Sequence, residues 1–94
     1  MGAGGVPNHG IKRTDARNLN INGDPNSKIQ RFKNGRIVQE RWYDEKGRAI
    51  RNRDYEHQDS NHSHFFPHDH AWNWSTGKGI RDKYPVLPDY KNFN

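Results

Sequence analysis

The dipeptide Asn34-Gly35 constrains the fold of this chain more than any other feature of the sequence. Asn-Gly is the preferred sequence of a two-residue β-hairpin turn, because both central positions of that turn need a positive φ angle. The residues on either side have the length and composition of strands. We therefore predict a strand over Lys28–Lys33 and a return strand over Arg36–Tyr43.

A second hairpin follows the first. Residues 44–47 (Asp-Glu-Lys-Gly) suit a longer loop with Gly47 in the left-handed conformation, which predicts a third strand over residues 48–55. The result is a three-stranded antiparallel meander. The two turns also imply four opposing pairs: Phe32 with Ile37, Ile29 with Glu40, Trp42 with Ile50, and Val38 with Asp54.

Side chains alternate between the two faces of a strand, so these registers predict how the meander divides. One face should carry the core residues Ile29, Val38, Trp42 and Ile50. The other should carry arginines with tyrosines and a glutamine among them: Arg41, Arg51, Arg53, Gln39, Tyr43 and Tyr55. Arginine and tyrosine on an open sheet face suit the binding of phosphates and bases. The alternative is a solvated face on which the charges are paired.

Residues 54–74 contain five of the six histidines in the chain. Pro67 lies in the middle of this segment and excludes a helix through it, so the histidines must lie on strands or loops. We predict a fourth strand from residues 64–66 and 70–74. It should be interrupted at Pro67 and placed at the edge of the sheet, where proline is tolerated.

The composition allows one small domain. The chain has 94 residues, 29% of them hydrophobic, and its mean hydropathy is −1.39. Residues 1–27 are rich in glycine and show no periodicity, which predicts a flexible tether or the cut end of a longer protein, with a short helix over residues 14–18 as a further option. Residues 28–94 should form the domain and end in a loop-like tail. The predicted fold class is α+β, rich in β-structure, with a small antiparallel sheet and long loop-like termini.

The chain carries a formal net charge of +5 and has a pI of about 9.7. A basic chain favours a polyanionic partner, nucleic acid before an anionic membrane, although excess charge can also serve solubility alone. No apolar run approaches the roughly 18 residues that span a bilayer, so we expect no membrane insertion. The absence of cysteine excludes a thiolate zinc site and fits a cytosolic or an exported protein equally well.

The histidines support two enzymatic interpretations and one that is not enzymatic. Cleavage of RNA by its own 2′-hydroxyl needs a base, an acid and cations near the phosphate. Without any cofactor, proton transfer would fall to His57 and to His68 or His70, while Asp54 orients an imidazole. Phosphate would be bound by Arg41, Arg51, Arg53 and Lys78.

The second interpretation is a divalent metal such as zinc, because histidines two residues apart on a strand lie on the same face. Its ligands would be His64, His68, His70 and Asp69. In the third interpretation the histidines are structural or sense pH, in a non-catalytic module that binds nucleic acid or protein.

Part of the sequence also resembles a known group of proteins. The run GRIVQERWYDEKGRAI, from Gly35 to Ile50, is followed by Asp54-Tyr55, by Phe66-Pro67-His68-Asp69-His70 and by Trp72. Together these phrases resemble the small C-terminal toxin domains of bacterial polymorphic toxins, over residues 28–74.

The resemblance implies a nuclease that is cut from a longer secreted or contact-delivered polypeptide. Such a domain acts in the cytoplasm of a target cell and is neutralised by a cognate immunity protein. Together with the histidines, the resemblance predicts a metal-independent RNase, with a metal-dependent DNase as the alternative enzyme.

Overall fold

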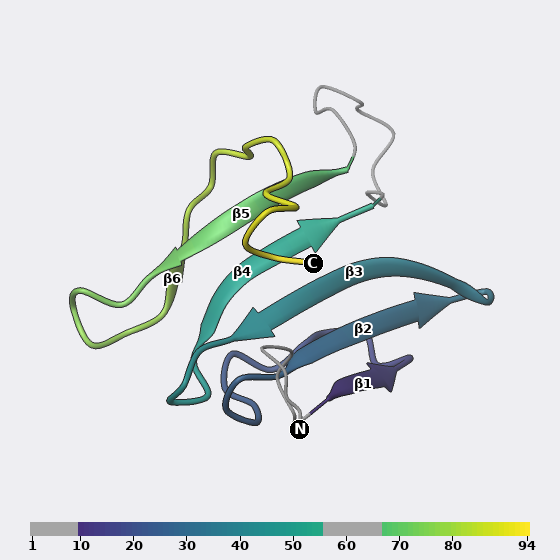
Figure 1. Ribbon diagram of the computed structural model, residues 1–94, viewed down its shortest axis with the longest axis horizontal. Helices are drawn as coiled ribbons and strands as arrows, with labels where there is room; N and C mark the ends of the chain where they lie inside the picture. Colours follow the sequence, from purple (N-terminus) through teal and green to yellow (C-terminus); the bar gives the residue numbers. More distant parts are fainter. Residues whose placement is uncertain (1–9, 56–66) are drawn as a thin grey trace.

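Six strands form a mixed sheet in the computed structural model, which describes residues 10–55 and 67–94 (Figure 1). The strands lie side by side in sequence order: β1 (Ile11–Thr14), β2 (Lys28–Lys33), β3 (Arg36–Tyr43), β4 (Ala49–Asp54), β5 (His68–Asn73) and β6 (Ile80–Arg81). β1 pairs with β2 in parallel, and the other neighbouring pairs are antiparallel.

The predicted meander is confirmed as β2, β3 and β4, but the predicted fold class needs two corrections. Residues 10–55 and 67–94 contain no helix, so this part of the chain is β-rich without being α+β. The sheet has six strands rather than four, and β5 lies between β4 and β6 rather than at the edge. Residues 64–66 lie outside the described residues. Residues 10–55 and 67–94 also contain no helix with the length and apolar character needed to cross a membrane.

Both predicted turns form. Asn34 and Gly35 have φ angles of 53° and 78°, and Gly47 has a φ angle of 77°. A side chain at Gly47 would also collide with the carbonyl oxygen of Gly23. Glycine is therefore required at this position both for its backbone conformation and for the close approach of the Gly23 backbone.

Two β-bulges shift the registers that turn geometry alone predicts. Phe32 pairs with Ile37 as predicted, but bulges follow between Arg31 and Phe32 and between Trp42 and Tyr43. A bulge adds one residue to one strand, and a shift of one residue exchanges the faces. The observed pairs are Ile29 with Arg41, Trp42 with Arg51, and Gln39 with Asp54. The predicted pairs of Ile29 with Glu40, Trp42 with Ile50, and Val38 with Asp54 are wrong.

One face of the sheet, which we name the Arg53 face, is built on ion pairs and aromatic rings. The Arg53 guanidinium donates two hydrogen bonds to Asp69, of 2.8 and 3.1 Å, and Arg51 Nε donates a third of 2.9 Å. The same Arg53 guanidinium lies between the rings of Trp42 and Tyr90, 4.8 and 4.4 Å from their centroids. Asp69 is fully buried, so its charge is balanced inside the protein rather than by water.

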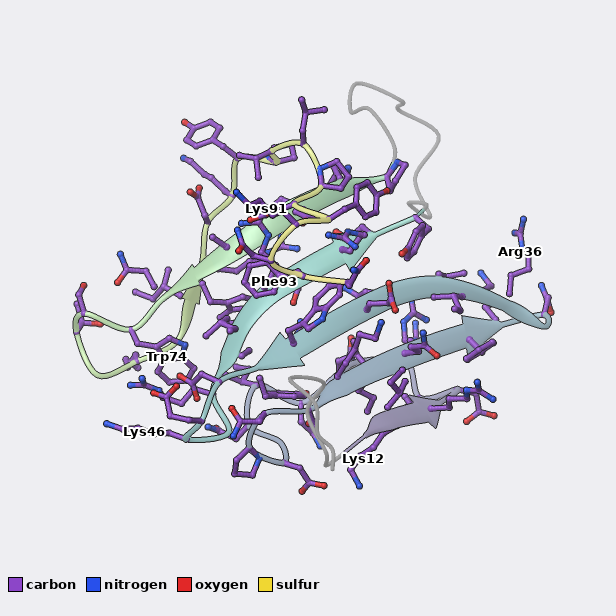
Figure 2. All side chains as sticks on the ribbon, in the orientation of Figure 1. Lys12, Arg36, Lys46, Trp74, Lys91 and Phe93 are labelled. Carbon is purple, nitrogen blue, oxygen red and sulfur yellow. The ribbon has the colours of Figure 1, made fainter. Side chains whose placement is uncertain are left out.

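The C-terminal segment covers the Arg53 face (Figures 1 and 2). Phe93 meets Trp42 edge to face, with ring centroids 5.7 Å apart, and its ring lies 5.2 Å from the Arg51 guanidinium. The backbone N–H of Asp89 donates a 3.1 Å hydrogen bond to Asp69. The predicted loop-like tail is thus tied to the sheet by an aromatic side chain and by a buried carboxylate.

The opposite face, which we name the histidine face, receives N-terminal residues. Leu19 is buried, and Arg41 donates hydrogen bonds of 2.7 and 3.0 Å to the carbonyl oxygens of Leu19 and Asn20. Residues 14–18 form no helix. The predicted tether therefore includes structured residues: residues 10–27 supply strand β1 and two hydrogen-bond acceptors for the buried Arg41 guanidinium.

We expect a chain that begins at Lys28 to be destabilised, although the tether prediction implies that it would not be. The truncation removes β1 and leaves the Arg41 guanidinium without two acceptors, and a hydrogen bond to a charged group contributes about 1.5–3 kcal/mol. Urea denaturation should show a free energy of unfolding about 3–6 kcal/mol below that of a chain beginning at Gly10. Equal transition midpoints for the two chains would show that residues 10–27 do not stabilise the domain, as the tether prediction expects.

Asp69→Asn should lower the free energy of unfolding by about 3–5 kcal/mol, because it removes the charge that balances two buried or half-buried guanidiniums. Asp15→Asn, at an exposed carboxylate, is the matched control. Thermal and urea denaturation at pH 7 measure both. If the two variants melt alike, the ion pairs of the Arg53 face contribute nothing to stability.

The same carboxylate predicts a dependence on pH. Burial raises the pKa of Asp69, but hydrogen bonds from Arg53 and Arg51 outweigh burial and hold the pKa below its ordinary value of 3.8. The stabilisation is therefore complete above that value and is lost as the pH falls through the lowered pKa. Acid titration below about pH 4 should destabilise the wild type, whereas Asp69→Asn should lose this part of the pH dependence.

Candidate metal centre

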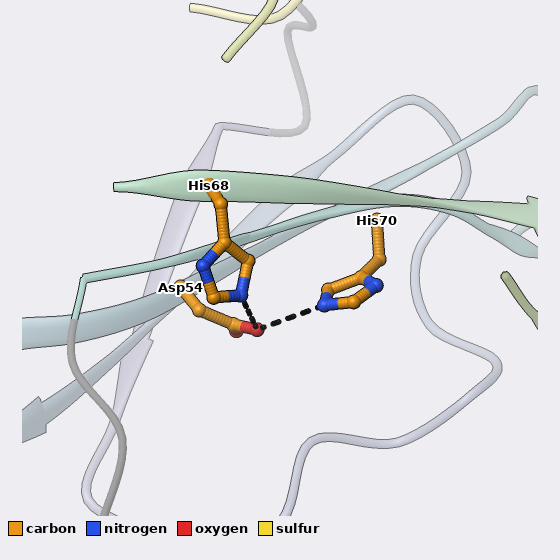
Figure 3. Close-up of side chains that lie close together, drawn as sticks. All are labelled: Asp54, His68 and His70. Atoms are coloured by element: carbon orange, nitrogen blue, oxygen red, sulfur yellow. Dashed lines mark ion pairs between the residues drawn. The ribbon is translucent and has the colours of Figure 1, made fainter. Parts of the chain in front are cut away.

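Asp54, His68 and His70 converge on the histidine face (Figure 3). Asp54 ends β4, and the pairing of β4 with β5 places His68 directly opposite it. His70 follows His68 by two residues and therefore projects from the same face of β5. All three side chains are buried. We name these three residues the histidine–aspartate cluster.

The distances within the cluster match those of metal ligands. Asp54 Oδ2 lies 3.4 Å from His68 Nε2 and 3.7 Å from His70 Nε2, and the candidate ligand atoms all lie within 4.8 Å of one another. A tetrahedral ion with bonds of about 2.0–2.1 Å separates its ligands by about 3.4 Å. The two separations from Asp54 Oδ2 are close to this value, so the three residues could hold such an ion once the two imidazoles approach one another as ligands.

The environment of His70 selects the tautomer that a metal requires. His70 Nδ1 lies 2.7 Å from the carbonyl oxygen of Asp82, which can only accept a hydrogen bond. The proton is therefore on Nδ1, and the lone pair of Nε2 points towards Asp54. Burial, helped by the charge of Arg81, lowers the pKa of His70 against the opposing effect of the Asp82 carbonyl. The imidazole is thus neutral at neutral pH, which is the form that binds metal.

Gln39 orients the carboxylate of the cluster. It lies opposite Asp54 on the neighbouring strand, and its Nε2 donates a 2.9 Å hydrogen bond to Asp54 Oδ1. Gln39 Oε1 in turn accepts a 3.3 Å hydrogen bond from Arg31 Nε. Because Oδ1 is engaged in this way, Oδ2 is the oxygen presented to the two imidazoles.

Arg41 lies on the same face, and its Nε and Nη1 donors are engaged within the fold. Besides the two carbonyl oxygens of the N-terminal segment, it donates a 2.7 Å hydrogen bond to Asn52 Oδ1. Its guanidinium also lies 5.0 Å from the ring centroid of Trp72, whose Nε1 donates to the same Asn52 oxygen at 3.0 Å. Arg41 therefore joins strands β3, β4 and β5 to the N-terminal segment.

The structure separates several residues that the sequence analysis grouped. Arg51 and Arg53 lie on the Arg53 face with Asp69, and not with Arg41 as expected. The arginine face that was expected to be open is covered, since Arg53 is 2% exposed. Lys78 is exposed, in the loop between β5 and β6. The roles of these four basic residues in nucleic-acid binding stay predictions.

The predicted metal ligands change in one respect. Asp69 alternates with His68 and His70 along β5, so it projects to the opposite face and pairs with arginine. Asp54, predicted as an orienting carboxylate, takes the place of Asp69 in the geometry. His57 and His64 lie outside the described residues. The sequence placed Gln39 on the predicted arginine face but gave no sign of its contact with Asp54, because only the observed register brings the two residues opposite each other.

Comparison with known proteins adds no relative: no family model matches the chain, and neither the curated proteins nor the solved structures give a match. The resemblance to toxin domains therefore stays a prediction, and the geometry of the cluster carries the functional argument.

Gln39→Leu should weaken zinc binding about 10–100-fold, as expected when a group that orients a metal ligand is removed. Calorimetric titration of the full chain with zinc measures the affinity. Gln30→Leu is the matched control, because Gln30 lies on the Arg53 face and hydrogen-bonds Glu40. Equal zinc affinities for the two variants would show that the Gln39 hydrogen bond does not orient Asp54.

Proposed function

We propose that this protein is a toxin-type nuclease whose phosphodiester-cleaving centre is the histidine–aspartate cluster with a bound divalent metal such as zinc. The observation that carries the proposal is the convergence of three ligand atoms at ligand–ligand distances. The net charge of +5 and the resemblance to polymorphic toxin domains support nucleic acid as the substrate.

Within residues 10–55 and 67–94, the set of donors fits a catalytic rather than a closed metal site. Two imidazoles and one carboxylate leave the fourth position of a tetrahedral ion for water or substrate, whereas structural zinc sites are closed by four protein ligands. A metal held by these three residues would lower the pKa of the water bound at its fourth position and would polarise phosphoryl oxygens. The chain itself contributes His70 held in the ligand tautomer and Asp54 oriented by Gln39.

The metal-independent RNase favoured by the sequence is the second candidate, and the state of His70 supports it. A neutral imidazole with a free Nε2 lone pair is a general base. Its ring centroid lies 5.0 Å from that of His68, which would then be the acid. His57, the other predicted proton-transfer residue, lies outside the described residues.

The biological setting rests on the resemblance alone. Under this proposal the domain is released from a longer secreted or contact-delivered polypeptide and acts in the cytoplasm of a target cell. A cognate immunity protein would neutralise it there.

A chelator experiment tests the proposed function. The full chain is incubated with labelled single-stranded RNA and double-stranded DNA, with and without EDTA, and then with added zinc, manganese or magnesium. Cleavage should stop with EDTA and return with one of the metals. His70→Ala and Asp54→Asn should lose both cleavage and bound zinc, while the exposed control Asp15→Asn should keep both.

Each other outcome selects a different interpretation. Cleavage that is insensitive to EDTA, with His68→Ala and His70→Ala each costing about 10²–10⁴ in rate, would replace the metal centre with acid–base catalysis. Zinc binding that raises the melting temperature without cleavage of RNA or DNA would mark a structural site in a binding module. The absence of both zinc binding and cleavage would overturn the proposal.

A further inference from the structure

Strand β6 places Arg81 beside the cluster. In the pairing of β5 with β6, Arg81 lies opposite Trp72. Opposing residues share a face, and Trp72 follows His70 by two residues, so Arg81 is on the histidine face. The next residue, Asp82, is bound twice to β5: its N–H donates to the Ala71 carbonyl at 2.8 Å, and its own carbonyl accepts from His70. The backbone of Arg81 is thus held opposite Trp72, two residues along β5 from His70.

The side chain of Arg81 is exposed, and within residues 10–55 and 67–94 it makes no ion pair or side-chain hydrogen bond. The guanidinium therefore keeps its donors available to solvent, on the face that carries the cluster.

The other arginines considered for phosphate binding are committed to the fold. Arg41 donates to Asn52 and to two backbone carbonyls, whereas Arg51 and Arg53 donate to Asp69 on the far face. An exposed guanidinium on the same face as the histidine–aspartate cluster suits a phosphate group, since its planar fork matches two phosphate oxygens.

We propose that Arg81 binds a phosphate of the nucleic-acid backbone next to the histidine–aspartate cluster. The contact holds the strand so that the neighbouring phosphodiester lies at the cluster. This inference rests on the proposed function for its substrate class, but the binding contact can be measured without cleavage. The sequence analysis gave the phosphate-binding role to Arg41, Arg51, Arg53 and Lys78 and did not consider Arg81.

The test measures binding of fluorescein-labelled 12-nucleotide single-stranded RNA and DNA by anisotropy, with EDTA present so that metal-dependent cleavage is off. The variants are Arg81→Gln and Arg81→Lys. Arg13→Gln is the control, because Arg13 is exposed on β1 at the other edge of the sheet and loses the same charge. Thermal melting of each variant reports whether it is folded.

Arg81→Gln should weaken binding about 5–150-fold and reduce the slope of log affinity against log salt by about 1, with melting unchanged. Arg81→Lys should recover the salt slope but only part of the affinity, because lysine cannot form the bidentate contact. Arg13→Gln should change affinity much less. In the cleavage assay, kcat/KM of Arg81→Gln should fall by at least the same factor as its affinity.

Three results would overturn the proposal. One is an equal loss of affinity in Arg81→Gln and Arg13→Gln, which would show that only net charge matters. Another is wild-type affinity in both Arg81→Gln and Arg81→Lys. The third is no oligonucleotide binding by the wild type. If no nucleic acid is cleaved but Arg81→Gln alone weakens binding, the phosphate contact stands and the nuclease proposal falls.

Discussion

The buried ion pair between Arg53 and Asp69 is the interaction on which both faces of the sheet depend. Asp69 lies between His68 and His70 in β5, and adjacent residues of a strand project to opposite faces. Because arginines of β4 hold Asp69 on one face, the two histidines must project from the other. There, the same strand pairing brings them to Asp54. A single constraint therefore orders the Arg53 face and also directs the cluster.

The packing of this domain uses charge where larger domains use apolar volume. Its buried apolar residues within residues 10–55 and 67–94 are few: Leu19, Val38, Trp42, Tyr43 and Ala49. Around them are buried polar groups that hydrogen-bond one another, with the Asn52 side-chain nitrogen as an exception in the described part of the chain. Glu40 is an example: burial raises its pKa, but hydrogen bonds from Tyr55, Gln30 and Lys28 lower it below the ordinary value. Such networks are stable only when complete, so each partner matters more than its size suggests.

The two faces have different electrostatic consequences for function. On the Arg53 face, positive charge is neutralised by Asp69 and covered by the C-terminal segment. On the histidine face, Arg81 is exposed on the strand next to the one that carries His68 and His70. The basic composition alone does not distinguish these cases, because a charge inside an ion pair adds little to the field that a polyanion meets.

The sequence by itself determined the local structure. Asn34-Gly35 and Gly47 specified the two turns because positive φ angles are a local requirement, and the strands Lys28–Lys33 and Arg36–Tyr43 followed with their bounds confirmed. The spacing of His68 and His70 placed both on one face for the same reason. Only the tertiary structure decided which residues meet across strands. A bulge displaced the register of β3 against β4 by one residue, which separated Arg41 from Arg51 and Arg53. The pairing of β4 with β5 brought Asp54 to the histidines, whereas Asp69 alternates with them along β5 and projects to the other face. Strands β1 and β6 are too short to be recognised from the sequence; they form because a sheet edge supplies their hydrogen-bond partners. The pairing of β6 with β5 places Arg81 on the histidine face.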